Sequence, residues 1–178
     1  MKELLIGCGS NSEKKICLDS VEWHNLTRLD NNPDHNPDVL WDLTVHPLPF
    51  GDEEFDEIHA YQVLEHLANQ GDYEFFFREF TEYARILKPG GYFCGSVPTG
   101  IWTWGDPSHK RVITRETLIF LDQSSYDQVG QTSMSDFRHI YKANFKLIFS
   151  QEDESGYYFI LQKVKSIDFA ERTAVRGD

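Results

Sequence analysis

The sequence predicts an α/β protein with a mostly parallel sheet of seven strands that ends in an antiparallel hairpin. Short apolar runs alternate with helical or loop segments, which is typical of parallel sheets covered by helices. The last two runs, 144–150 and 157–164, are separated by one short polar segment, which indicates a hairpin. With 178 residues, the chain is long enough for one domain with a single core.

The first predicted strand runs into Gly7, Cys8 and Gly9 after only six residues. Glycine adopts backbone conformations closed to other residues and lets a ligand approach the main chain closely. A pair of glycines alone often only closes a turn. The polar residues that end the next strands favour a ligand-binding loop instead.

Three further parallel strands are predicted, and the first two end at a carboxylate. Residues 25–29 lead to Asp30, residues 38–41 lead to Asp42, and the fourth strand covers 55–61. The carboxyl ends of parallel strands meet at one edge of a sheet, where ligands of such folds bind. The sequence therefore predicts a binding cleft at this edge.

The segments between the strands follow from local rules. Residues 31–37 are rich in Asn, Asp and Pro and leave no room for a full helix. Asp72 is a good N-cap for a long helix that runs to about Leu87. A Lys-Pro-Gly-Gly turn at 88–91 should end this helix, and the fifth strand follows at 92–97.

The chain then enters a loop rich in Trp, Gly and Pro at 101–111, followed by a helix capped by Thr114 that runs through Leu121. We expect one domain over residues 1–165 and a polar tail over residues 166–178.

Composition limits the possible partners and the compartment. The net charge of −12 disfavours broad nucleic-acid binding. No apolar run reaches the roughly 18 residues of a membrane-spanning helix, and no signal-peptide pattern is evident. The three cysteines, Cys8, Cys17 and Cys94, follow no disulfide or zinc spacing. A cytoplasmic protein with reduced thiols is therefore expected, without a membrane partner.

Several motifs in register resemble the class I S-adenosylmethionine-dependent methyltransferases, and most closely their small, type-11-like branch. They are residues 5–9 (LIGCG), 38–43 (DVLWDL), 48–58 (LPFGDEEFDEI), 63–67 (VLEHL), 85–91 (RILKPGG) and 106–111 (DPSHKR). The resemblance implies a Rossmann-like class I methyltransferase fold, trimmed between the first and third strands. It also implies S-adenosyl-L-methionine as the cofactor.

The resemblance assigns cofactor-binding roles residue by residue. The positions are Gly7, Cys8, Gly9, Asp30, Asn31, Asp42, Leu43, Tyr61 and Gln62. The glycine loop would lie against the methionine and ribose, and Asp30 would accept hydrogen bonds from both ribose hydroxyls. Asp42 would face the adenine amino group beside the backbone N–H of Leu43. Tyr61 and Gln62 would lie near the methionine and the sulfonium.

The chain departs from the family pattern at three positions. Leu5 replaces an acidic residue of the first strand, and Asn11 replaces the third glycine of the loop. Some relatives hold a divalent metal with a Glu-x-x-Glu-His pattern, but Gln62 stands at the first of these positions. We therefore expect no metal site, and a structural role for Glu65 and His66 in a short helix is favoured.

A base is required if the acceptor is a hydroxyl or a protonated amine, and His109 and His66 are the candidates. Trp102 and Trp104 would either wall an acceptor pocket or pack the loop down. Lys110 and Arg111 would add local positive charge near the acceptor. The acceptor is expected to be a small molecule, a sugar or a protein side chain.

Two other functions fit part of the pattern. A nicotinamide-dependent oxidoreductase shares the Gly-x-Gly turn and the following Asp30, but Ser12 stands where its third glycine should be. A cofactor- or partner-binding module without catalysis is consistent with the missing acidic residue at Leu5.

Overall fold

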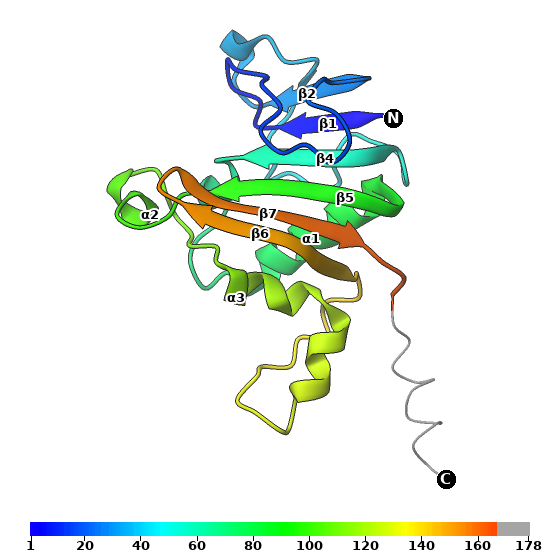
Figure 1. Ribbon diagram of the computed structural model, residues 1–178, viewed down its shortest axis with the longest axis vertical. Coiled ribbons are helices and arrows are strands. Elements are labelled where there is room, and N and C mark those ends of the chain that lie inside the picture. Colours follow the sequence, from blue (N-terminus) through cyan, green and yellow to red (C-terminus); the bar gives the residue numbers. More distant parts are fainter. Residues whose placement is uncertain (167–178) are drawn as a thin grey trace.

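The computed structural model describes residues 1–166, which contain a seven-stranded sheet in the order β3-β2-β1-β4-β5-β7-β6. The strands are β1 (Glu3–Ile6), β2 (Leu26–Asp30), β3 (Val39–Leu40), β4 (Phe55–Tyr61), β5 (Leu87–Val97), β6 (Phe145–Asp153) and β7 (Gly156–Lys163). The strands β1 to β5 are parallel, and β7 runs antiparallel to both β5 and β6 (Figure 1). The predicted fold class is confirmed. Of the tail predicted at 166–178, only residue 166 is among the described residues.

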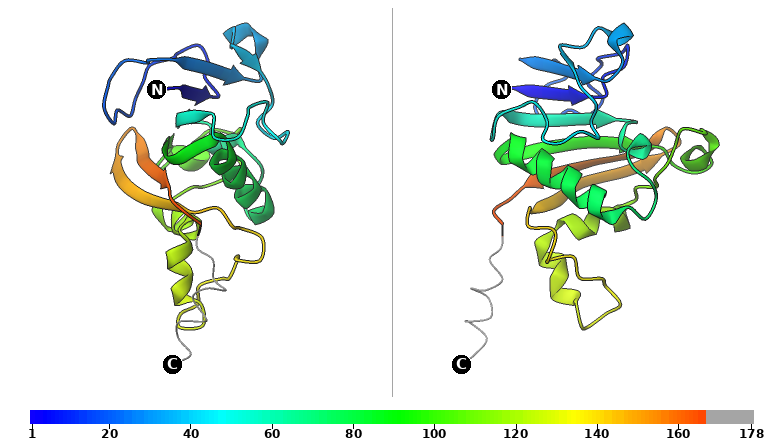
Figure 2. Two further views of the ribbon diagram at one scale, coloured as in Figure 1. Left: turned by 90° about the vertical axis from the view of Figure 1, so that its right-hand side faces the viewer. Right: turned by 180° about the vertical axis from the view of Figure 1, so that it is seen from behind.

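The long helix α1 (Tyr73–Ile86) covers one face of the sheet, as the right panel of Figure 2 shows. Shorter helical elements follow the strands: η1 (Pro33–His35), η2 (Leu64–His66), α2 (Trp102–Gly105), α3 (Arg115–Leu118), η3 (Ile119–Leu121) and η4 (Gln123–Gln128). Both predicted N-caps are confirmed. The Asp72 side chain accepts from the Phe75 N–H, and the Thr114 hydroxyl accepts from the Thr117 N–H.

Two strands are longer than the sequence predicted. The helix ends near Leu87 as expected, but β5 begins at that residue and includes the Pro-Gly-Gly segment. Gly91 allows this, because a side chain there would meet the Asp56 carbonyl oxygen at 2.8 Å. In the hairpin, residues 151–153 extend β6 although they are polar, since their side chains are exposed.

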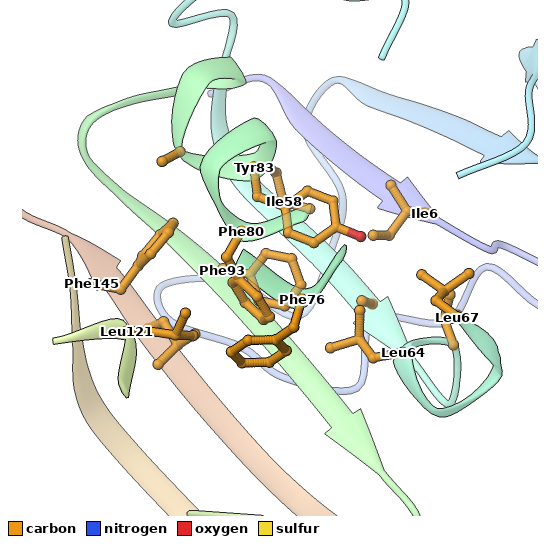
Figure 3. Close-up of a cluster of buried hydrophobic side chains, with 14 of the residues drawn as sticks. Ile6, Ile58, Leu64, Leu67, Phe76, Phe80, Tyr83, Phe93, Leu121 and Phe145 are labelled. Atoms are coloured by element: carbon orange, nitrogen blue, oxygen red, sulfur yellow. The ribbon is translucent and has the colours of Figure 1, made fainter. Parts of the chain in front are cut away.

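The main core lies between α1 and the sheet. Aromatic side chains of the helix pack on β5, with Phe80 and Tyr83 at centroid distances of 5.5 and 4.9 Å from Phe93 (Figure 3). These three side chains are at most 1 % exposed. Burying one such side chain stabilises the fold by roughly 1.5–3 kcal/mol. This packing fixes α1 on β5.

On the opposite face, a loop without helix, residues 10–24, connects β1 to β2 and carries a buried lysine. The Lys14 ammonium lies 2.6 Å from Glu3 Oε1 and 3.2 Å from Glu57 Oε2, and His59 Nε2 lies 2.8 Å from the same Glu57 oxygen. Burial disfavours the ammonium, yet hydrogen bonds to Glu3 and Glu57 raise the pKa of Lys14. We call these four residues the lysine cage. It holds the loop on β1 and β4 without a helix between β1 and β2.

Among the described residues, no helix has both the length and the apolar character needed to cross a membrane.

Candidate active site

A cleft of about 300 Å³ opens where the carboxyl ends of β1, β2, β3 and β4 meet. It is lined by Gly7, Gly9, Leu29, Asp30, Asn31, His35, Trp41, Asp42, Leu43, Gln62, Val63, His66 and Leu67. The structure therefore brings together most of the residues predicted to bind the cofactor, which come from four separate segments of the chain.

The glycine loop follows β1 directly, and both glycines have positive φ angles, +58° at Gly7 and +55° at Gly9. At Gly7 an added Cβ would stand only 2.5 Å from a methyl group of Val63, whereas at Gly9 nothing lies within 4 Å. Gly7 thus allows close packing of the loop on the segment after β4, and Gly9 leaves the main chain open toward the cleft.

Asp30 ends β2 and ties the glycine loop to the neighbouring strand. Its Oδ2 accepts from the Gly9 N–H at 2.8 Å, and its Oδ1 accepts from the Asn32 N–H at 2.8 Å. Burial favours the neutral acid, but these two bonds and His35, whose Nδ1 lies 3.2 Å from Oδ1, lower the pKa of Asp30 below its ordinary value. An ionised carboxylate has about four acceptor positions, so at least one remains for a ligand hydroxyl.

The third segment, after β3, supplies an aromatic wall and a second carboxylate. Trp41 is held by a bond from its Nε1 to the Val45 carbonyl at 3.0 Å. Asp42 is exposed, and its Oδ1 accepts from the N–H and the hydroxyl of Thr44, both at 2.8 Å. Asp42 therefore caps a turn and still presents its second oxygen beside Leu43.

Gln62 follows β4 with a positive φ of 57°, a conformation that side chains with a Cβ rarely adopt. Its N–H donates to the Ser96 carbonyl at 2.9 Å, which fixes the residue at the junction of β4 and β5. Unusual backbone conformations of this kind cluster at functional sites. The strained position lies in the wall of the cleft.

Two of the predicted positions do not present side chains to the cleft. Cys8 is 4 % exposed, and burial raises the pKa of its thiol. The Tyr61 hydroxyl lies 2.6 Å from His59 Nδ1 and accepts from the Ile16 N–H at 3.1 Å, on the face covered by the 10–24 loop. Successive side chains of a strand point to opposite faces, so Tyr61 shares the face of His59.

The two candidate bases lie next to each other at the edge of the cleft, beside Glu65. The Nε2 atoms of His66 and His109 are each 4.0 Å from Glu65 Oε1, and the two imidazole rings are 4.8 Å apart. The loop that carries His109 is held here by bonds from the Lys110 and Arg111 N–H groups to the Glu65 carbonyl. Residues separated by more than 40 positions thus form one cluster.

Glu65 is 1 % exposed, and neither of its carboxylate oxygens has a hydrogen-bond partner within the described part of the chain. Burial raises the pKa of this carboxyl to about 7. A structural role was expected for Glu65 and no metal site was expected, and both stay predictions. The structure groups ligand atoms of Glu65, His66 and His109 within 4.8 Å of one another.

The loop after β5 differs from expectation at three side chains. Trp102 and Trp104 are 64 % and 62 % exposed, so they neither pack the loop down nor bury themselves in a pocket. The prediction that Arg111 adds positive charge near the acceptor is wrong. Arg111 is 4 % exposed and turns toward α1, where its guanidinium lies 3.4 Å from Glu79 Oε2 and donates to the Asp72 carbonyl.

Sequence reasoning missed His35 and Trp41 as residues of the cleft. Trp41 immediately precedes Asp42 at the end of a predicted strand. This position could have indicated that Trp41 lines the cleft. His35 lies in the loop after Asp30 and reaches the cleft because η1 folds the loop back, with Asn32 capping its first turn. No local pattern in the sequence indicates this fold-back.

Comparison with known families identifies the class. A family model described as a methyltransferase domain matches residues 4–95, which is more than half of the chain. The chain therefore belongs to this methyltransferase family, and the predicted membership of the class I, type-11 branch is confirmed. The family supports an enzyme with S-adenosyl-L-methionine as its cofactor and argues against the nicotinamide-dependent alternative.

Solved structures share the fold at low sequence identity. A methyltransferase dependent on S-adenosylmethionine from Archaeoglobus fulgidus is 17 % identical, with a TM-score of 0.56 over 91 % of this chain and 86 % of that one. One from Mesorhizobium loti is 12 % identical, with a TM-score of 0.55 over 91 % and 90 %. A further match is a Haloferax volcanii complex between the Trm112 methyltransferase activator and a methyltransferase. It shows 13 % identity and a TM-score of 0.54 over 92 % of this chain and 83 % of that one. A sequence search among curated proteins finds no significant match.

Proposed function

We propose that the cleft binds S-adenosylmethionine and that the protein transfers its methyl group to a small-molecule, sugar or protein acceptor. One observation carries the proposal: the glycine loop, Asp30 and Asp42 converge on a single cleft in a chain of the methyltransferase family. Asp30 accepts the ribose hydroxyls, Asp42 and Leu43 hold the adenine, and Gln62 lies beside the methionine. Asn31 flanks the ribose, and Cys8 contributes its backbone.

The sulfonium is already activated, so alignment of donor and acceptor supplies much of the catalysis. Holding the two reactants in line contributes roughly 7–11 kcal/mol toward the barrier. The residues of the cleft therefore act chiefly by fixing the cofactor. The proton of a hydroxyl or ammonium acceptor passes to the Nε2 of His109 or His66.

The acceptor approaches from the side of the loop after β5. A second cleft of about 390 Å³ lies there, with Thr99, Thr103, Arg115 and Tyr157 in its walls. The Tyr157 hydroxyl is buried, and a side chain at its neighbour Gly156 would come within 3.3 Å of Gln62 Nε2. Polar groups next to the proposed methionine site support a small, hydroxyl-bearing acceptor. A cytoplasmic location, with the three free cysteines reduced, completes the proposal.

Calorimetry with S-adenosylhomocysteine tests the first half of the proposal. We expect saturable binding with one site per chain, and no binding of a nicotinamide dinucleotide under the same conditions. The reverse result would contradict the proposal. Tight binding of the cofactor product without transfer to any acceptor, in a screen with labelled cofactor, would favour the non-catalytic module.

Replacement of His109 with alanine tests the second half. We expect the methyl-transfer rate to fall by about 100-fold or more, the usual contribution of a general base. The affinity for S-adenosylhomocysteine should stay unchanged, since His109 does not line the cofactor cleft. His139→Ala is the matched control, because His139 is exposed and outside the cluster. A wild-type rate in His109→Ala would leave His66 as the remaining base.

A further inference from the structure

The cluster of Glu65, His66 and His109 has the composition and spacing of a metal site. One ligand atom from each residue lies within 4.8 Å of the other two, and both histidine Nε2 atoms are 4.0 Å from Glu65 Oε1. Tetrahedral metal–ligand bonds of about 2.0–2.2 Å place ligand atoms about 3.3–3.6 Å apart, so the side chains would close by about 1 Å around an ion. The 4.0 Å contacts are too long for hydrogen bonds between imidazole and carboxylate.

The outer hydrogen bonds of both histidines direct their Nε2 lone pairs toward Glu65. His109 Nδ1 lies 2.9 Å from the Trp102 carbonyl oxygen, and His66 Nδ1 lies 3.3 Å from the Ser108 carbonyl oxygen. A carbonyl only accepts, so the proton of each ring is on Nδ1. The Ser108 hydroxyl, 3.1 Å from His66 Nδ1, donates to Asp106 Oδ1 and accepts from the same ring. Histidines that ligate metals are oriented in this way.

The carboxylate provides an independent observation. Glu65 is 1 % exposed, and both of its oxygens are buried without a hydrogen-bond partner in the described residues. A buried carboxylate without a partner is costly, and a bound cation removes that cost. We propose that Glu65, His66 and His109 bind one divalent transition-metal ion at the edge of the cofactor cleft.

The lysine cage serves as an internal comparison. Glu3, Glu57 and His59 are grouped in the same way, but the Lys14 ammonium lies among them, 2.6 and 3.2 Å from the two carboxylates. That group already has its cation. Glu65 has no lysine or arginine within ion-pair distance in the described residues. Its charge is therefore left for a cation from solution to balance.

The donor set selects the kind of ion. Two imidazoles and one carboxylate suit Zn²⁺, Co²⁺ or Fe²⁺, whereas Mg²⁺ prefers oxygen ligands. Three protein ligands leave coordination positions open for water or a ligand oxygen. Because His66 also lines the cofactor cleft and is partly exposed, the open side is reached from that cleft.

The relation of the ion to methyl transfer rests on the proposed function. With the ion bound, both Nε2 lone pairs would be occupied, so the base role proposed for His109 or His66 applies to the metal-free protein. The ion would then bind the acceptor oxygen and lower the pKa of its proton. Binding of the ion itself does not depend on that function. It can be measured without cofactor or acceptor, so failure of one proposal is distinguishable from failure of the other.

Titration of the full-length, tag-free chain with Co²⁺ tests the inference by visible absorption and calorimetry. The Cys17→Ser background is used because Cys17 is an exposed thiol that also binds cobalt. We expect one equivalent of Co²⁺, displaced by Zn²⁺ and not by excess Mg²⁺. Glu65→Gln and His109→Ala should weaken binding by at least about 10-fold, the lower end of the loss seen when only an outer-shell partner is removed. His139→Ala should bind as the background does.

Glu65→Gln keeps the side-chain shape and removes a buried charge, so it remains informative if His109→Ala fails to fold. Circular dichroism of each variant checks the fold. Absence of stoichiometric Co²⁺ binding in the background protein would overturn the inference, as would unchanged affinity in folded Glu65→Gln. S-adenosylhomocysteine affinity, measured in parallel without metal, should be the same in Glu65→Gln and the background.

Discussion

Asp30→Ala is expected to weaken S-adenosylhomocysteine binding far more than Asp42→Ala. Asp30 would lose two charge-assisted bonds to the ribose, each worth roughly 1.5–3 kcal/mol. It would also lose its bond to the Gly9 N–H, which holds the glycine loop in place. The affinity should fall on the order of 100-fold or more. Asp42 is exposed and would lose one bond, with the backbone contacts remaining.

Asp30→Asn and Asp38→Ala are the matched controls for this measurement. Asparagine keeps one acceptor oxygen in the same place. The affinity of Asp30→Asn for S-adenosylhomocysteine should therefore lie between those of the wild type and Asp30→Ala. Asp38 pairs with Arg28 at 3.1 Å and does not line the cleft, so its removal should leave the affinity unchanged. Equal affinities of Asp30→Ala and the wild type in calorimetry would show that the ribose is held elsewhere.

Gly7→Ala is expected to destabilise the fold and to abolish measurable cofactor binding. Alanine at a φ of +58° costs roughly 1–2 kcal/mol, and its Cβ would stand 2.5 Å from Val63. Overpacking of this kind costs about 1–3 kcal/mol more. Urea unfolding should therefore show a loss of about 2–5 kcal/mol, the sum of these two terms.

Gly9→Ala separates the two causes, because its φ is also positive but nothing lies within 4 Å of its added Cβ. We expect Gly9→Ala to lose only the stability that alanine costs at a positive φ, about 1–2 kcal/mol. Val63→Ala in the Gly7→Ala background should recover part of the stability by removing the clash. If Gly7→Ala and Gly9→Ala are equally stable, the contact with Val63 does not limit the loop.

The sequence was sufficient to predict the sheet and the binding edge because their determinants are local. The apolar runs that form β1 and β4 are short and sharply bounded, and Asp72 and Thr114 are strong caps. Glycine and carboxylate at successive strand ends then place the cleft, since parallel strands share their carboxyl edge. Gly7, Asp30, Asp42 and Gln62 reach it for this reason.

The features that the sequence did not predict depend on contacts between distant segments, or on which face of a strand a side chain points to. Tyr61 follows its strand at the predicted position, but the alternation of side chains turns it to the other face. Arg111 belongs to a basic run in the sequence, yet packing of the loop against α1 buries it beside Glu79. The unpartnered carboxylate of Glu65 emerges only when His66 and His109 are brought to it by the fold.

The lysine cage has a consequence for how the molecule opens. The 10–24 loop has no helical ladder, so its order depends on contacts with β1 and β4, chiefly those of the buried Lys14 ammonium. Regions of this kind exchange their amide protons through subglobal opening rather than through fraying of single bonds. The Ile16 N–H, which donates to Tyr61, belongs to this cooperative unit. We therefore expect the amides of this loop and of the β1 and β4 residues that it contacts to be exposed to exchange together.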